Sequence, residues 1–156
     1  MFSLKIVKST LALLALTLCL SSPAMAAAER GTKEEAKALV ERAAAYLREN
    51  GKEKAAAEFN KPDGKFTDRD LYVFAMSMDG IRLAHGKNQK LVGLSIEDFK
   101  DVDDKPYGKE IMDLGRGAGS GWVDYKFTDP LTKKIAEKTS YVLREGDVVI
   151  AAGAYK

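Results

Sequence analysis

The first regular pattern of apolar positions along the chain indicates an amphipathic helix between residues 32 and 51. Thr32 and Glu35 have the spacing of a capping box, and Gly51 is a typical helix terminator. The apolar positions recur at helical spacing and form one stripe, made of Ala36, Leu39, Val40, Ala43 and Leu47. A shorter helix, KEKAAAEF, is predicted to follow and to end at the turn residues of NKPDGKF.

The pattern then changes to that of strands. LYVFAMSM is apolar at odd and even positions alike, which predicts a strand covered on both faces. Asp79-Gly80 is a strong two-residue hairpin signal, so we predict a type I′ turn and an antiparallel return over IRLAH. Three more strands are predicted over GWVDYKF, KIAEKTSYVLRE and DVVIAAGAY.

The segment between the hairpin and the last three strands reads as loop with short helices. Five short strands joined mostly by tight turns predict one antiparallel sheet, and therefore an α+β fold. The long helix is expected to cover one face. The irregular middle segment must cover part of the other face, because a strand that is apolar on both faces has to be buried on both. A loop-rich segment over a sheet is where a small cavity forms most easily.

The N-terminal segment, residues 1–26, reads as a secretory signal. It has Lys5 and Lys8, an apolar run over residues 11–20, and an A-x-A pattern that ends at Ala26. We expect cleavage after Ala26, which leaves one domain over residues 27–156 in the periplasm or outside the cell. An uncleaved anchor is the less favoured alternative, because the apolar run is shorter than the roughly 20 residues that span a bilayer.

Charge and cysteine content exclude several classes of function. Without Lys5 and Lys8 the chain has 23 basic and 23 acidic residues, so nothing favours nucleic acid or an anionic membrane surface as a partner. The one cysteine, Cys19, lies in the signal segment, which leaves no disulfide and no thiolate chemistry. A single histidine without thiolates does not make a zinc site, and C-x-x-C-H is absent. We therefore predict no metal and no cofactor.

Four stretches together resemble a known family. They are LYVFAMSMDGIRLAHGKNQKLVG, GSGWVDYKF, EKTSYV and AAGAY, in this order. They resemble the single Cache domains of type 2, the extracytoplasmic sensor modules of bacterial chemoreceptors and histidine kinases. The resemblance implies a PAS-like fold, with a long N-terminal helix behind a five-stranded antiparallel sheet. It also implies a pocket on the opposite face, closed by the middle segment, that binds small organic molecules, often short carboxylates.

Two features depart from the family pattern. The family often has His-Pro where this chain has His85-Gly86, which implies a more flexible loop. Family members usually continue into a transmembrane helix and a signalling module, whereas this sequence stops at Lys156. We therefore expect the signal to pass through a separate membrane receptor, or through a homodimer formed by the N-terminal helix.

His85 and Lys138 are the first candidate ligand-binding residues. From the sequence alone, His85 is either a backbone-bonded histidine at a strand end or a hydrogen-bond donor to a ligand. Lys138 is either a solvated lysine on an edge strand or the cation that receives a carboxylate. By strand parity Lys138 shares a face with Ser140, and Thr139 shares the other with Tyr141. The resemblance implies that Lys138 and Ser140 line the pocket.

Three aromatic residues complete the candidate site. Trp122 and Tyr125 have opposite parity on one strand, so one of them is expected to be core. Because Tyr125 shares its face with Val123 and Phe127, we expect it to be core-like and Trp122 to roof the pocket. Tyr107 lies in the covering segment and is expected to close over a ligand as a hydroxyl donor.

The remaining motifs do not indicate catalysis. GRGAGSG precedes a strand and does not match a phosphate-binding loop, and DVDDK lacks the glycine and distal glutamate of a calcium loop. Ser120 is not in a G-x-S-x-G motif. We predict a binding domain without catalytic residues. The alternative is a structural or protein-interaction module whose pocket is filled by side chains.

Overall fold

The computed structural model describes residues 29–156, and the predicted signal segment lies outside the described residues. The helices are α1 (Lys33–Asn50), α2 (Lys52–Phe59) and α3 (Tyr107–Arg116), with single turns of 3₁₀ helix at Gln89–Leu91 and Ile96–Asp98. The strands are β1 (Thr67–Asp68), β2 (Leu71–Ser77), β3 (Arg82–His85), β4 (Ser120–Thr128), β5 (Ile135–Glu145) and β6 (Val148–Tyr155). None of the helices described here is both long and apolar enough to cross a membrane.

All strand pairs are antiparallel and make one sheet in the order β1-β2-β6-β5-β4, with β3 also paired to β2. The five predicted strands are present, which confirms the α+β prediction. The sequence reasoning missed the two-residue β1, which pairs only with the first residues of β2. The last strand of the chain, β6, lies at the centre of the sheet and is buried along its whole length.

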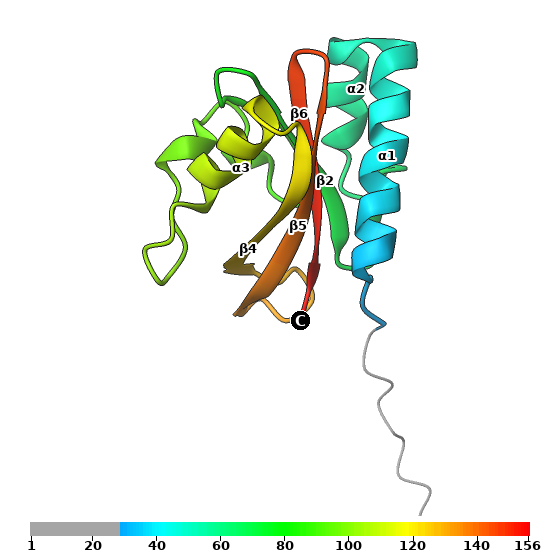
Figure 1. The fold of residues 1–156 in the computed structure, drawn as a ribbon. Coiled ribbons are helices and arrows are strands. Elements are labelled where there is room, and N and C mark those ends of the chain that lie inside the picture. Colours follow the sequence, from blue (N-terminus) through cyan, green and yellow to red (C-terminus); the bar gives the residue numbers. More distant parts are fainter. Residues whose placement is uncertain (1–28) are drawn as a thin grey trace, which may run out of the picture.

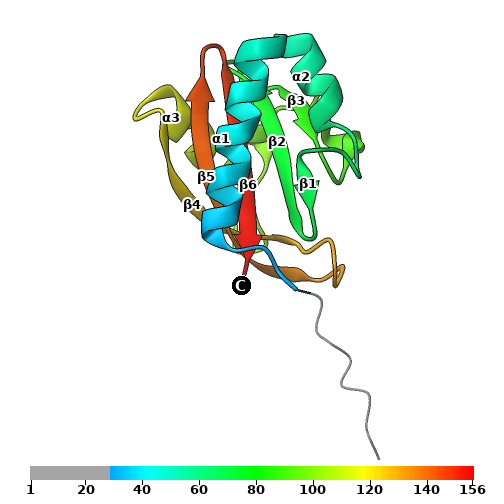
Figure 2. The same cartoon turned by 90° about the vertical axis from the view of Figure 1, so that its right-hand side faces the viewer.

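Helix α1 covers one face of the sheet and lies across β5 and β6 (Figures 1 and 2). The capping box is confirmed: the Thr32 hydroxyl accepts from the Glu35 amide at 3.1 Å, and the Glu35 carboxylate accepts from the Thr32 amide at 2.8 Å. The predicted apolar stripe is buried in the core on this face. A homodimer formed through that stripe is therefore a wrong expectation, because the sheet already covers it.

Helix α3 and the loops around it cover the opposite face, as predicted (Figure 1). Tyr107, Ile111 and Met112 of α3 are buried in the core cluster on this face. The approach is close at Gly115, where a Cβ atom would lie 2.7 Å from a methyl carbon of Val149 in β6. The covering segment is thus packed firmly on the sheet through α3.

The β2–β3 turn differs from the predicted type I′ turn. Gly80 has a φ of 82°, whereas Asp79 is not left-handed, and the Gly80 amide donates to the Ser77 carbonyl at 2.9 Å. The Ser77 amide bonds to the Ile81 carbonyl, so the loop has three residues, with glycine in the left-handed position. The register also slips once in this hairpin: Ala75 pairs with Ala84 and Met76 with Arg82.

The slip decides which side chains of β3 face the covering segment. Strict alternation puts Arg82 and His85 on opposite faces of a strand. Because Leu83 is an extra residue between the two pairs, Arg82 and His85 instead point to the same face. The bulge therefore adds an arginine to the side of the sheet that carries the predicted pocket.

Candidate functional site

Three basic side chains are buried together between the sheet and the covering segment. Lys138 of β5 is 1% exposed, and Arg82 and His85 of β3 are 2% and 4% exposed. Within residues 29–156, neither Lys138 nor Arg82 has a carboxylate within salt-bridge distance, although thirteen other such pairs form. Two buried cations without an acidic partner are costly for a folded protein.

Lys138 lies in a box of aromatic rings. Its ammonium donates to the Tyr72 hydroxyl at 2.8 Å and lies 4.1 Å from the centre of the same ring. The other rings within 6 Å of the ammonium are those of Phe74, Tyr125, Phe127 and Tyr155. Ring faces attract a cation, but one neutral hydroxyl satisfies only one of its three donors.

Arg82 and Tyr107 face the same space with unused polar atoms. The Nε and Nη1 atoms of Arg82 and the hydroxyl of Tyr107 are buried and have no hydrogen-bond partner among the described residues. The guanidinium stacks on the ring of Phe99 at 4.3 Å, which holds its plane in place. An unmade hydrogen bond at a buried polar group costs roughly 1–3 kcal/mol, and more at a charged one. These atoms are thus ready to receive an acceptor.

Burial shifts the pKa values of this cluster. It lowers the pKa of Lys138 to about 7, an effect that Asp70 partly offsets. It lowers the pKa of His85 to about 3, with further lowering from the charges of Lys138 and Arg82. Burial also lowers the pKa of Arg82, but a guanidinium stays protonated in proteins. At neutral pH the cluster therefore has one permanent cation, one lysine near its titration point and a neutral imidazole.

The hydrogen bonds of His85 determine which ring nitrogen carries its proton. Nδ1 accepts from the backbone amides of Asn88 at 3.0 Å and Lys87 at 3.4 Å. We therefore assign the proton of the neutral ring to Nε2, which makes that nitrogen a donor. The two interpretations of His85 are therefore compatible. Nδ1 is bonded to the backbone, and Nε2 is left to donate to a ligand.

Tyrosine and serine hydroxyls form the floor of the site. Tyr125 and Ser140 hydroxyls are 3.0 Å apart, and the Tyr125 ring stacks on Tyr107 at 4.3 Å. The Tyr155 hydroxyl donates to the Thr128 carbonyl at 2.8 Å, so the Tyr72 hydroxyl, 3.1 Å away, donates to Tyr155. A directed chain of hydrogen bonds therefore runs from the Lys138 ammonium to the last residue of β4.

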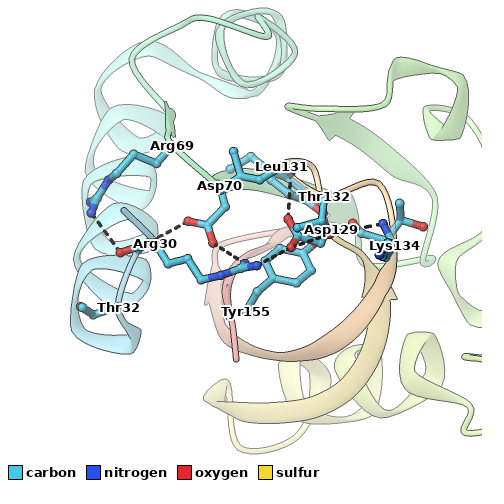
Figure 3. Close-up of polar contacts among 12 residues, drawn as sticks. Arg30, Thr32, Arg69, Asp70, Asp129, Leu131, Thr132, Lys134 and Tyr155 are labelled. Carbon is cyan, nitrogen blue, oxygen red and sulfur yellow. Dashed lines mark hydrogen bonds and ion pairs between the residues drawn. The ribbon is translucent and has the colours of Figure 1, made fainter. Parts of the chain in front are cut away.

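That chain ends beside a second buried polar cluster (Figure 3). Asp70 and Asp129 are fully buried, and Arg30 bridges them with distances of 3.3 Å and 2.6 Å. Asp70 also accepts from the Gly31 amide at 2.7 Å, immediately before α1. These carboxylates are well paired, unlike the buried cations, so we assign this cluster a structural role: it fastens the start of α1 to the end of the sheet.

Apart from a pocket of about 210 Å³ that borders Lys138 beside Lys126 and Lys156, two spaces adjoin the basic cluster. The first, which we call the inner chamber, offers about 10 Å³ to a water-sized molecule. It is lined by Tyr72, Phe74, Arg82, His85, Tyr107, Tyr125, Phe127 and Lys138. The second, which we call the outer pocket, has a volume of about 310 Å³ and lies between the β4–β5 loop, Arg69 and residues 87–88. Tyr72, His85 and Phe127 line both spaces and so lie between them.

The structure brings five of the six predicted site residues to the inner chamber or its floor: His85, Tyr107, Tyr125, Lys138 and Ser140. Their contacts with a ligand stay a prediction. Trp122 is the exception and the expectation that it roofs the pocket is wrong. It lies on the α1 face, 37% exposed, with Tyr141 beside it and the Lys33 ammonium over its ring.

The alternation of side chains along β4 was predicted correctly. The error for Trp122 was in the choice of the face of β4 that carries the site. Tyr125 pairs directly with Lys138, and Val123 with Ser140, so these four residues share the face that carries the site. Trp122 pairs with Tyr141 on the other face. Once Lys138 is placed in the pocket, the register alone would have selected Tyr125.

Sequence reasoning also missed Arg82 and Gly153. No sequence signal identifies the bulge that turns Arg82 inward. Gly153 is part of the AAGAY stretch, and a Cβ atom there would lie 2.3 Å from the Ser140 hydroxyl and 2.6 Å from the Lys138 Cε atom. The glycine therefore leaves the room in which the Lys138 side chain lies.

We expect Gly153→Ala to weaken ligand binding at least tenfold, because the added methyl group must displace Lys138 and Ser140 and also meets the Thr139 carbonyl oxygen at 2.7 Å. Isothermal titration measures the affinity, and circular dichroism checks the fold. Gly146→Ala in the β5–β6 turn controls for a general loss of stability: its φ of 60° strains an alanine, but nothing lies within 4 Å of the added Cβ atom. Unchanged affinity in a folded Gly153→Ala protein would show that Lys138 does not need this space.

Metal binding and nucleophilic catalysis have no support in the part of the chain that the structure covers. Residues 29–156 contain no group of three or more His, Cys, Asp or Glu side chains that could hold a metal ion. The imidazole of His85 has no carboxylate partner within this range. What the arrangement provides chemically is a set of donors and positive charge around a small enclosed space.

Comparison with known proteins gives a consistent result. The family model described as single Cache domain 2 matches residues 12–156. No curated protein matches the chain.

Several solved structures share the fold. One, described as the structural basis for carboxylic acid recognition by a Cache chemosensory domain, has a TM-score of 0.67 and 23% identity, over 78% of this chain and 91% of the other. A chemotaxis protein from Vibrio parahaemolyticus RIMD 2210633 has a TM-score of 0.64 and 26% identity, over 79% and 87%. The periplasmic sensor domain of a chemotaxis protein has a TM-score of 0.61 and 23% identity, over 78% and 88%.

Proposed function

Because the chain belongs to the single Cache domain 2 family, we propose that it is an extracytoplasmic sensory domain that binds a short organic carboxylate in the inner chamber. The observation that carries the proposal is the pair of buried cations, Lys138 and Arg82, with no acidic partner in residues 29–156. A carboxylate supplies the negative charge and the acceptors that both lack. The similar Cache domain described for carboxylic acid recognition supports this choice of ligand class.

Each residue of the chamber has a role in this proposal. The Lys138 ammonium forms a charge-assisted hydrogen bond to one carboxylate oxygen, and the Arg82 guanidinium donates to the ligand from its unpartnered nitrogen atoms. Tyr107 donates its free hydroxyl hydrogen, and His85 donates from Nε2. Tyr125, held by Ser140, forms the floor. We do not expect these groups to catalyse a reaction of the ligand. They bind its negative charge, and none of them is placed to activate a nucleophile.

The small size of the chamber links binding to a change of shape. A space of about 10 Å³ holds roughly one water molecule, so a carboxylate has to move side chains apart to enter. The ligand therefore favours a more open arrangement of the covering segment and shifts the population toward it. We propose that a separate membrane partner reads this change, with the domain exported by the signal segment and cleaved after Ala26. Mass spectrometry of the exported protein tests the cleavage site.

A thermal-shift experiment tests carboxylate binding. Acetate, propionate, lactate and pyruvate are added to the folded protein, and acetamide and propionamide serve as neutral controls of similar shape. A ligand present at 100 times its Kd stabilises the folded state by about 2.7 kcal/mol, which raises the melting temperature by several degrees. We expect a shift for at least one carboxylate and none for the amides. No shift for any carboxylate, with the protein folded, contradicts the proposal.

The near-filled chamber favours one alternative, a structural or interaction module with a vestigial pocket. On that hypothesis a carboxylate has no effect, and removal of Lys138 leaves the behaviour of the protein unchanged apart from its stability. The unpartnered atoms of Arg82 and Tyr107 speak against it, because a pocket that no longer binds is expected to lose costly buried polar groups.

The pH dependence of binding follows from the pKa of Lys138. In the free protein burial lowers this pKa to about 7, and a bound carboxylate raises it, so above pH 7 binding must bring in a proton. Arg82 stays charged, His85 stays neutral, and the surrounding tyrosines stay neutral because burial raises their pKa values. We expect the affinity to fall by up to tenfold per pH unit between about 7 and 9.

Isothermal titration at pH 6, 7, 8 and 9 measures this fall, and titration in buffers of different ionisation enthalpy counts the protons taken up. The Lys126→Met protein is the control: it loses a paired, partly exposed lysine and keeps Lys138, so its affinity should fall with pH as that of the parent does. A flat affinity from pH 7 to 9 would show that Lys138 is already fully charged in the free protein.

A further inference from the structure

The outer pocket is a cavity that the proposed carboxylate site does not use. Its volume of about 310 Å³ is far larger than that of the inner chamber. The two spaces share the side chains of Tyr72, His85 and Phe127, and the ring centres of His85 and Phe127 are 6.3 Å apart. A molecule held in the chamber by one end would therefore extend past these rings into the outer pocket.

The charged side chains that line the outer pocket are all basic. Its lining includes Arg69, Lys87 and Lys133 and no acidic residue. This is unexpected in a domain whose basic and acidic residues are equal in number. The pocket on the other side of Lys138 is different, because its lining contains as many carboxylates as ammonium groups. A basic lining is thus a property of this pocket rather than of the surface in general.

Two of these cations are free of acidic partners in the described part of the chain. Lys87 donates to the backbone carbonyl of Pro62 at 3.3 Å, and Lys133 forms no salt bridge. Arg69 is already engaged by Asp68 and Glu35. Lys87 and Lys133 are therefore the groups available to a second negative charge.

A buried polar group points to a ligand at the junction. His85 is 96% buried, and its Nε2 atom has no hydrogen-bond partner among residues 29–156 while Nδ1 is held by the backbone. Beyond it, Phe127, Pro130 and Leu131 give the outer pocket an apolar side. Together the two spaces therefore offer buried cations, a donor beside aromatic rings, an apolar wall and exposed cations.

We propose that the inner chamber and the outer pocket form one elongated site for a linear dicarboxylate, an inference that rests on the proposed function. One carboxylate meets Lys138 and Arg82 in the chamber. The rings of His85 and Phe127, in contact with centres 6.3 Å apart, move aside so that the carbon chain passes them, and the second carboxylate meets Lys87 and Lys133. The site then selects dianions over monoanions of the same length, because only a dianion neutralises both groups of cations.

Isothermal titration with matched ligands tests this selection. The ligands are succinate, glutarate and adipate, each compared with its monomethyl ester, which removes one charge, keeps the carbon chain between the carboxyl groups and adds one methyl group. The buffer contains 0.15 M salt, so that long-range attraction between exposed charges is screened. We expect at least one dicarboxylate to bind tenfold or more tightly than its ester.

A double variant, Lys87→Gln with Lys133→Asn, locates the second carboxylate. Lys133 has a φ of 60°, and asparagine tolerates this left-handed conformation. We expect the variant to lose most of the preference for the dicarboxylate while its affinity for the monomethyl ester stays within twofold. The matched control is Lys134→Asn, a neighbouring lysine that does not line the pocket.

The outcomes separate this inference from the proposed function. Equal affinity for diacids and esters overturns the elongated site and leaves carboxylate binding intact. An equal loss for both ligand types in the double variant also overturns it, because the two lysines would then act only by general attraction of anions. If no mono- or dicarboxylate binds, both proposals fall.

Discussion

Replacing Lys138 with methionine is expected to abolish the carboxylate-dependent rise in melting temperature and to make the ligand-free protein more stable. The two effects have one cause. The ammonium is fully buried, has one neutral hydrogen-bond partner and has no acidic partner in residues 29–156. Methionine reproduces the unbranched side chain as far as Cε and packs among the surrounding rings. The energetic cost of the buried charge is therefore removed, and so is the ligand contact.

The size of the stability gain follows from the pKa. Burial lowers the pKa of Lys138 from 10.5 to about 7, and each unit corresponds to about 1.4 kcal/mol. At pH 7 the folded protein therefore bears a penalty on the order of 4 kcal/mol, less the bond to Tyr72 and any relaxation around the site. We expect Lys138→Met to raise the free energy of unfolding at pH 7 by about 2–3 kcal/mol, which urea denaturation measures.

The same pKa predicts how stability changes with pH. Because the pKa is lower in the folded state, the unfolded chain binds the proton more tightly between about pH 7 and 10. This contribution to the stability of the unsubstituted protein should therefore be smallest at pH 7 and should increase steadily up to pH 9. The methionine variant should lack this part of the pH dependence.

Lys126→Met is the matched control for Lys138→Met. Lys126 lies on the neighbouring strand β4, is paired with Asp103 and is partly exposed. We expect its loss to change the free energy of unfolding by less than 1 kcal/mol and to leave ligand binding intact. A Lys138→Met protein that is less stable than the parent, or that still responds to carboxylates, would show that the ammonium is solvated or is not the ligand contact.

Arg30→Ala is the substitution with the largest expected loss of stability. It leaves Asp70 and Asp129 buried without their shared cation (Figure 3). Removing one partner of a fully buried pair costs about 3–5 kcal/mol; because the Arg30 side chain is 35% exposed, we expect about 2–3 kcal/mol. Urea denaturation at pH 7 measures the change, and a loss below 0.5 kcal/mol would contradict the bridging role.

The acid sensitivity of this cluster gives a further readout of the same variant. Burial by itself would raise the pKa of Asp129, but hydrogen bonds from Arg30, Leu131 and Thr132 lower it below its usual value. Its stabilising effect is therefore present above about pH 4 and is lost as the pH falls through the lowered folded-state pKa. Without Arg30 the loss should begin at a higher pH. Arg30→Lys, which keeps the charge but not the fork of donors, should lie between parent and alanine variant.

Several features of the fold were predictable because they depend on local chemistry. The capping box at Thr32, the stripe of α1 and the period-2 strands each follow from spacing along the chain. The alternation of β5 also placed Lys138 and Ser140 on one face without any knowledge of the partner strands. The family resemblance rested on similar local stretches and was confirmed over residues 12–156.

The sequence by itself determined the main elements and their alternation, and the family resemblance implied that Lys138 lies on the covered face. Tertiary structure alone decided which face of β4 met that lysine, so Tyr125 rather than Trp122 borders the chamber. It also decided that an extra residue in β3 turned Arg82 inward beside His85. The physical reason is that side-chain direction within a strand is a local property, whereas register, bulges and the choice of face depend on the strand across the ladder, which lies far away in the sequence.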